Sequence, residues 1–142
     1  MRRSIRATRP RKNAENVSAR EYLTRRLRLL EAAKSAAARF DHVDVIATPT
    51  VMLTPHILTD EVSQEKFWAH NRNIVHNLMP TNYLALCAAT LPVGLDRVGM
   101  PVGLQFIARG GDDERLVAIA CAAERVLGTP REILGAPPMC IG

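Results

Sequence analysis

Two apolar runs joined by a short polar link make up residues 90–108, TLPVGLDRVGMPVGLQFIA. Both runs are apolar with little alternation, which is the pattern of strands in a sheet that is covered on both faces. We therefore predict strands over residues 90–95 and 101–108. The link contains Asp96 and Gly99, which favour a turn, so we expect the two strands to follow each other through that turn.

A helix is predicted directly after these strands, and it ends at Leu127. Asp112 or Asp113 can cap its N-terminus. Its apolar side chains recur at helical spacing and form one stripe: Leu116, Ile119, Ala120, Ala123, Val126 and Leu127. Gly128 is typical of the position after a helix, and Pro130 prevents the helix from continuing. Residues 131–142 are predicted to form a loose tail.

On the other side of the two strands, the pattern predicts helices and one further strand. Residues 82–89 can form a short helix, and residues 63–79 form a longer one that Pro80 kinks or ends. Its broad apolar face consists of Phe67, Trp68, Asn71, Ile74, Val75 and Leu78. The β-branched run at residues 43–47 predicts a buried strand that ends at residues 48–50, where Pro49 cannot donate a hydrogen bond. Residues 51–60 are predicted as a loop.

The N-terminal third is basic, whereas the rest of the chain is slightly acidic. Residues 1–39 carry 12 Lys and Arg against 3 Glu, a net charge of +9, and the remainder carries −4. We predict a helix over residues 18–40, opened by a capping box of Ser18 and Glu21. Its apolar stripe is formed by Leu23, Leu27, Leu30, Ala33 and Ala37. Residues 1–14 are predicted to be a basic, flexible tail.

Length and composition indicate one domain or part of one, because the chain has 142 residues and 47% of them are hydrophobic. Helices and strands intermix, which predicts α/β architecture, and only three strands are available. We therefore expect a piece of a larger sheet. The sequence contains no membrane-spanning run and an odd number of cysteines, three, without redox or metal spacing. These features predict a cytoplasmic protein that does not bind a membrane.

No complete catalytic constellation is visible among the nucleophiles and bases. The serines are Ser4, Ser18, Ser35 and Ser63, and none lies in a glycine-rich turn; the lysines are Lys12, Lys34 and Lys66. Cys87 and Cys121 are interpreted as core thiols. The histidines, His42, His56, His70 and His76, have no metal-ligand spacing. We therefore predict no catalytic residue, no cofactor and no metal site.

Four segments in order resemble the C-terminal region of the amidase-signature family. Ser18–Leu23 is similar to that family's helix opening, and Phe40–Thr50 to its segment of an aspartate, an apolar strand and Thr-Pro-Thr. Asn82–Gly94 is similar to a stretch that begins with Asn and ends with Pro-x-Gly. The strongest match is Gly99–Phe106, GMPVGLQF, which is close to the family's Gly-Leu-Pro-Val-Gly-Leu-Gln pattern. The resemblance covers residues 15–138.

The resemblance implies a C-terminal piece of the family's mixed β-sheet fold, with about three strands covered by helices, between tails at residues 1–14 and 139–142. Members hydrolyse amides with a Ser–cis-Ser–Lys triad that lies upstream of the matched region, and no triad residue can be assigned here. In tRNA-dependent amidotransferase A subunits, an Asp stands seven residues before the matching Asn; here that residue is Val75. This difference favours an amidase or allophanate-hydrolase-like lineage.

Two functional hypotheses follow. In the first, the chain is a C-terminal fragment of an amide-hydrolysing enzyme, inactive alone, whose partner is a complementary amidase chain with the catalytic segment or a second copy of itself. In the second, it is a non-catalytic binding or regulatory module that residues 1–14 tether to an acidic partner. The basic tail lacks the aromatic residues or structured basic face of a nucleic-acid site, so no specific nucleic acid is expected.

Overall fold

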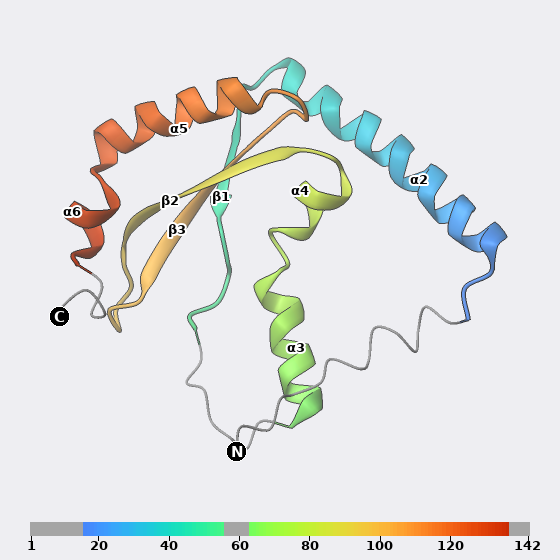
Figure 1. Cartoon of the computed structure of the whole chain (residues 1–142), viewed down its shortest axis with the longest axis horizontal. Coiled ribbons are helices and arrows are strands. Elements are labelled where there is room, and N and C mark those ends of the chain that lie inside the picture. Colours follow the sequence, from blue (N-terminus) through green and yellow to red (C-terminus); the bar gives the residue numbers. More distant parts are fainter. Residues whose placement is uncertain (1–15, 56–62, 137–142) are drawn as a thin grey trace.

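The structure is a computed structural model, and it describes residues 16–55 and 63–136. The elements follow in the order α2 (Ala19–Ala37), η1 (Ala38–Asp41), β1 (Ile46–Pro49), α3 (Gln64–Ile74), α4 (Met79–Tyr83), β2 (Cys87–Leu95), β3 (Pro101–Ala108), α5 (Asp113–Leu127) and α6 (Pro130–Leu134). The strands form one sheet in the order β1-β3-β2, with antiparallel pairing throughout (Figure 1). This confirms an α/β piece with three strands. The predicted tails at residues 1–14 and 139–142 lie outside the described residues.

The two strands predicted from residues 90–108 are present and pair as a hairpin. Asp96 makes the turn, because its Oδ1 accepts hydrogen bonds from the backbone N–H groups of Val98 and Met100, each at 2.9 Å. Gly99 adopts a φ of 80°, which few other residues tolerate. The hairpin is irregular near Pro92, where the register shifts.

The short helix predicted for residues 82–89 is wrong for most of its length, because α4 ends at Tyr83. β2 begins at Cys87, three residues before the predicted start at Thr90, because residues 87–89 pair with the end of β3. Ala85 stops the preceding helix with a φ of 53°, in the left-handed region. Strand pairing thus overrides the helix propensity of this Ala- and Leu-rich segment.

The first predicted strand exists, but it lies further along the chain than residues 43–47. β1 runs from Ile46 to Pro49, so Pro49 belongs to the strand that it was predicted to terminate. In the described sheet β1 pairs with β3 alone and is therefore an edge strand, where a residue without an N–H group is tolerated. Asp44, just before β1, forms an exposed ion pair with Arg115.

The helix predicted for residues 63–79 is divided in two. Ser63 caps α3 by accepting a hydrogen bond from the Lys66 N–H at 3.3 Å, and α3 ends at Ile74. Pro80 does not end a helix but lies in the first turn of α4, where its missing N–H costs nothing. The predicted apolar face is half-buried, and the Phe67 and Trp68 rings meet edge to face with centroids 5.6 Å apart.

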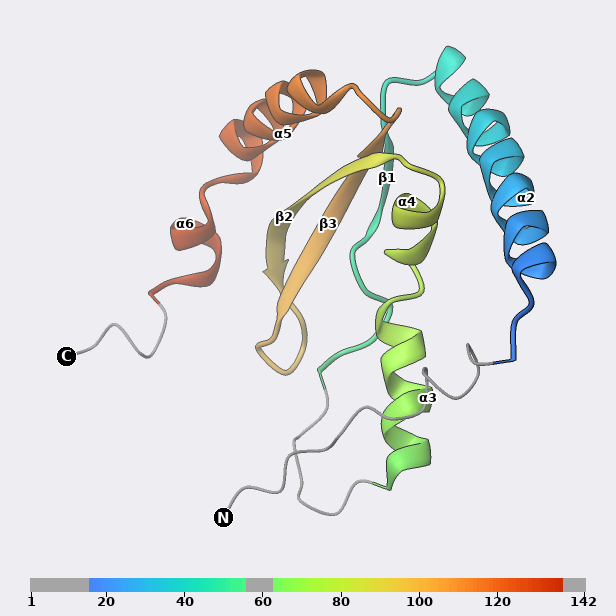
Figure 2. The ribbon, with the colours of Figure 1, turned by 45° about the vertical axis from the view of Figure 1, so that its right-hand side comes forward.

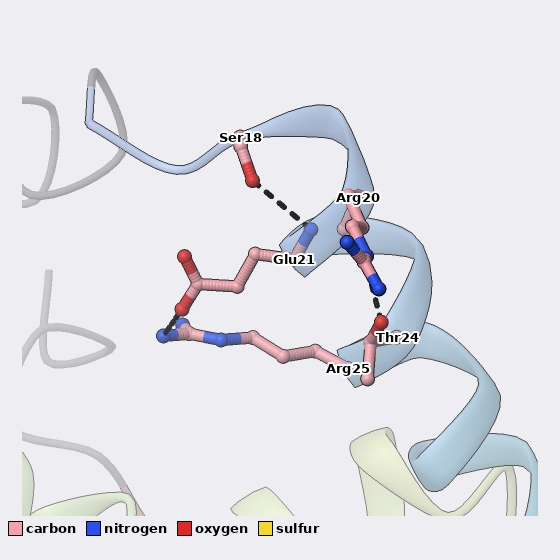
Figure 3. Close-up of polar contacts among 5 residues, drawn as sticks. All are labelled: Ser18, Arg20, Glu21, Thr24 and Arg25. Atoms are coloured by element: carbon pink, nitrogen blue, oxygen red, sulfur yellow. Dashed lines mark hydrogen bonds and ion pairs between the residues drawn. The ribbon is translucent and has the colours of Figure 1, made fainter.

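The N-terminal helix is confirmed, and α2 is capped as predicted by Ser18 (Figure 3). The Ser18 Oγ accepts from the Glu21 N–H at 3.2 Å, but the Glu21 carboxylate bonds to Arg25 instead of closing the capping box. The stripe predicted for the core does not pack into it. Leu23 and Leu27 are 57% and 62% exposed. In both views α2 projects away from the sheet (Figures 1 and 2).

The core lies between α5 and one face of the sheet. Leu116 and Ala120 of α5 are buried, and Leu116 packs with Cys87 and Ala108 at the paired ends of β2 and β3. The stripe of α5 is buried only in its first half, because Val126 is 87% exposed. Cys121 is exposed, so its interpretation as a core thiol is wrong.

The segment predicted as a loose tail begins with a helix. Pro130 ends α5 as predicted but also opens α6, at a position where proline is favoured. Thr129 and Glu132 form a complete capping box: the Thr129 N–H and Oγ1 contact the Glu132 Oε2 at 2.7 and 2.8 Å, and the Thr129 Oγ1 accepts from the Glu132 N–H. The sequence Thr-Pro-Arg-Glu carries this signal, which the prediction of a tail overlooked.

This capping box predicts a pH-dependent contribution to stability. The hydrogen bonds from the Thr129 backbone and side chain hold the pKa of Glu132 below its ordinary value. A depressed pKa stabilises the fold above the unfolded-state pKa, about 4.3, and this contribution is lost as the pH falls through the folded-state pKa. We expect Glu132→Ala to destabilise the chain at pH 7 but less at pH 3, as measured by urea unfolding.

The double-mutant cycle with Thr129→Ala provides the control. In the Thr129→Ala background, Glu132→Ala is expected to have a smaller effect at pH 7, because Thr129→Ala removes the hydroxyl that contacts the carboxylate and leaves only the bond from the Thr129 backbone N–H. An equal effect of Glu132→Ala at both pH values would contradict this role.

The described part of the chain leaves much apolar surface and two strand edges uncovered. β1 and β2 are the outer strands of the described sheet, so each has one edge without a strand partner among the described residues. Large side chains are exposed on α2, α5 and the hairpin, including Val98 at 74%. We expect the isolated chain to be marginally stable and self-associated in size-exclusion chromatography with light scattering. A monomer that melts cooperatively well above about 60 °C would contradict this expectation.

Candidate functional site

The described serine hydroxyl and lysine amine groups either cap helices or are exposed to solvent. Ser18 and Ser63 are occupied as helix N-caps, and Ser35 lies exposed on α2. Lys34 and Lys66 are also exposed, one near the end of α2 and one in the first turn of α3. Ser4 and Lys12 lie outside the described residues. The described serines and lysines therefore do not form an assembled nucleophile and base.

The buried thiol of Cys87 is held in an environment that suppresses its reactivity. Its Sγ donates to the Arg109 carbonyl at 2.9 Å. Burial, followed by the nearby Asp113 carboxylate, raises the pKa of the Cys87 thiol above its ordinary value. Because the thiolate is the nucleophilic form, Cys87 is a core thiol, as predicted.

Histidines and acids do not assemble a metal site within residues 16–55 and 63–136. In that part of the chain, no group of three or more His, Cys, Asp and Glu side chains is arranged to hold a metal ion. His42 and His76 are exposed, and His70 is half-buried on α3. His56 and Cys140 lie outside the described residues.

A row of polar side chains crosses one face of the sheet, opposite α5. Thr48, Gln105 and Thr90 are register partners on β1, β3 and β2, so their side chains lie next to one another on the same face. Gln105 is only 1% exposed, and its Nε2 donates to the Thr81 Oγ1 of α4 at 3.4 Å. The Thr48 Oγ1 is buried without a hydrogen-bonding partner.

Two further bonds extend this polar row. The Thr50 Oγ1 donates to the Thr90 Oγ1 at 3.3 Å, and the Asn77 Nδ2 donates to the Pro49 carbonyl at 2.7 Å. The second bond ties the segment between α3 and α4 to β1. Hydroxyl and carboxamide groups can orient a polar chain or ligand, but they include no general base near neutral pH and no activated nucleophile. The row is therefore suited to positioning and not to hydrolysis.

The comparison with known proteins assigns this fold to a family. The family model described as Amidase matches residues 1–117. The chain belongs to the amidase-signature family. This confirms the resemblance based on the four ordered segments, of which GMPVGLQF supplies Gly99 and Met100 of the turn and most of β3.

Its relatives are considerably longer. The chain is 40% identical over 126 residues to a 2-amino-5-chloromuconic acid deaminase of Comamonas testosteroni, a match that covers 89% of this chain and 27% of the deaminase. It is 36% identical over 91 residues to a fatty acid amide hydrolase of Medicago truncatula, covering 63% of this chain and 15% of that enzyme. This amidase-signature chain therefore spans about a quarter or less of the relatives that it matches.

A solved structure shows the same arrangement of elements. The structure of 6-aminohexanoate cyclic dimer hydrolase superimposes with a TM-score of 0.69 and 24% identity, over 82% of this chain and 26% of that chain. At this identity the likeness establishes the fold. Among the described residues of this family member, no helix has the length and apolar character needed to cross a membrane.

The polar row is the feature that the sequence prediction missed. Gln105 lies in the motif that carried the resemblance, and the threonines were interpreted only as strand ends or strand residues. A polar residue within an otherwise apolar strand was the available signal, because a buried carboxamide needs a hydrogen-bonding partner. The partners, Thr81 and the register neighbours Thr48 and Thr90, become visible only once the strands are paired.

Proposed function

We propose that this chain supplies the C-terminal part of an amidase-signature hydrolase that cleaves a carbon–nitrogen bond, and that it is inactive without the catalytic part. The observation that carries the proposal is the family match combined with its extent, which is 27% of the deaminase. The 142 residues contain no Gly/Ser-rich segment with two serines and a lysine. The described serines that cap helices are engaged with backbone N–H groups.

Within this role, the chain contributes structure and part of the substrate-binding surface, and not the nucleophile. The polar row on the sheet and the α3–α4 segment bonded to it form a surface that can position a neighbouring chain or a substrate. Val75, where a glutamine-binding carboxylate would be expected in an amidotransferase subunit, is a half-buried apolar residue at the end of α3. This favours an ordinary amide over glutamine as the substrate.

Chemical labelling of the purified chain tests its inactivity. We expect no labelling by a fluorophosphonate serine-hydrolase probe and no release of ammonia or amine from simple linear amides. The deaminase of Comamonas testosteroni, treated in parallel, serves as the positive control. Labelling of a serine of this chain together with turnover of an amide would refute the proposal.

A further inference from the structure

The helix α2 presents an apolar surface that the described part of the chain does not cover. Tyr22, Leu23, Leu27 and Leu30 are between 51% and 62% exposed. In the sequence they recur at helical spacing, so they share one side of α2. Exposure of one large apolar residue is ordinary, but a contiguous set on one helix marks an interaction surface.

A groove lies along this surface, between α2 and the end of α4. Its volume is about 410 Å³, and its lining includes Tyr22, Leu29 and Leu30 from α2 and Tyr83 from α4. Leu23 and Leu27 continue the apolar surface beyond the lining of the groove. A small molecule in the groove would leave those two leucines exposed, whereas a helix laid along α2 would cover both parts.

The positive charge of the groove and of α2 indicates which kind of partner binds there. Arg25 and Arg26 also line the groove, and none of the described residues that line it is acidic. The helix Ala19–Ala37 contains five basic residues and two glutamates, so α2 carries a net charge of +3. Two copies of α2 packed together would bring like charges close, which is unfavourable at an interface. A partner segment with carboxylates next to its apolar side chains complements both features.

Two polar contacts of α2 involve the arginines that line the groove: the Arg26 Nη1 donates to the Tyr22 hydroxyl at 3.4 Å, and Arg25 forms an ion pair with Glu21. Figure 3 shows Glu21 bonded to Arg25 and the Thr24 hydroxyl donating to the Arg20 carbonyl. At about 3.6 residues per turn, Arg20, Thr24 and Arg28 lie on the opposite side of the helix from Tyr22 and Leu29. The helix thus has a solvated side, and its apolar side is the one that requires a partner.

We propose that the groove between α2 and α4 binds an amphipathic helix that carries both apolar and acidic side chains and belongs to the catalytic part of an amidase domain. This inference rests on the proposed function and adds the surface through which the two parts join. Apolar contacts at Leu29 and Leu30 anchor the helix, and Arg25 and Arg26 orient it through its carboxylates. Such binding is weakened by salt, because the arginines are exposed.

Binding measurements with matched variants test this surface. The probe is the part of the Comamonas testosteroni deaminase upstream of the segment that this chain matches, and calorimetry measures its affinity for the full chain. Leu30→Gln and Arg26→Glu are each expected to weaken binding roughly tenfold or more. The controls, Val126→Gln on exposed α5 and Arg28→Glu on the other side of α2, are expected to leave the affinity within about twofold. Circular dichroism verifies that every variant is folded.

Each outcome is decisive. Binding that neither groove variant weakens would refute the groove as the docking surface while leaving the proposed function intact. Absence of binding by the wild-type chain would refute both. If light scattering shows a dimer of this chain that Leu30→Gln or Arg26→Glu dissociates, the occupant is a second copy, which also contradicts the proposal.

Discussion

Replacing Leu116 by alanine is expected to lower the free energy of unfolding by about 2–5 kcal/mol, the range for truncating a large buried aliphatic residue. Leu116 is 3% exposed and is the largest apolar side chain in the small core formed with Cys87 and Ala108. The partly buried Val45, Ala89 and Phe106 pack against this core, so truncating Leu116 removes contacts to all of them. At about 3 kcal/mol, the melting temperature falls by roughly 10 °C for a chain of this length.

The adjacent residue on the same helix supplies the control. Val117 is 57% exposed, so Val117→Ala is expected to change the stability by at most about 0.5 kcal/mol. Urea unfolding followed by the fluorescence of Trp68, the single tryptophan, measures both variants. Equal effects at positions 116 and 117 would show that α5 does not pack on the sheet as described.

The second large effect is expected at Gly110, where two backbone segments approach closely. A Cβ at this position would lie 1.9 Å from the carbonyl oxygen of Ala85. A side chain could rotate away from such a contact, but a backbone carbonyl cannot, so the ends of β2 and β3 would have to separate. We expect Gly110→Ala to cost about 3 kcal/mol or more, at or above the upper end of the range for overpacking.

Gly99→Ala is the comparison for this steric effect. Gly99 has a positive φ of 80°, but a Cβ there would meet no atom within 4 Å. Its cost is limited to the left-handed backbone conformation, about 1–2 kcal/mol. Circular dichroism melts of the two variants should therefore rank Gly110→Ala as clearly more destabilising. The reverse ranking would contradict the close approach between Ala85 and Gly110.

The sequence was most informative where local signals and packing agree. The turn at Asp96 and Gly99, the N-cap at Ser18 and the extent of α5 were predicted because each depends on neighbouring residues. The start of β2 at Cys87 was not predicted, because it depends on pairing with Ala108, 21 residues away in the chain. Local propensity cannot contain that information.

Burial was predicted less well than secondary structure. The apolar stripe of α2 has helical spacing, but Leu27 is 62% exposed because the described chain provides nothing to cover it. Cys121 lies beside the buried Ala120 in sequence but points to another side of α5. For the candidate site, the motif containing Gln105 was recognised, whereas the polar row was not, because its members come from three strands.

Reconstitution of hydrolysis is the most direct test of whether this chain is the C-terminal part of an amidase. The upstream part of the Comamonas testosteroni deaminase would be mixed with the full chain, and release of ammonia from 2-amino-5-chloromuconic acid and from simple amides would be measured. The proposal predicts hydrolysis in the mixture and in neither component alone. Hydrolysis by this chain alone, or a stable mixed complex without any hydrolysis, would contradict it.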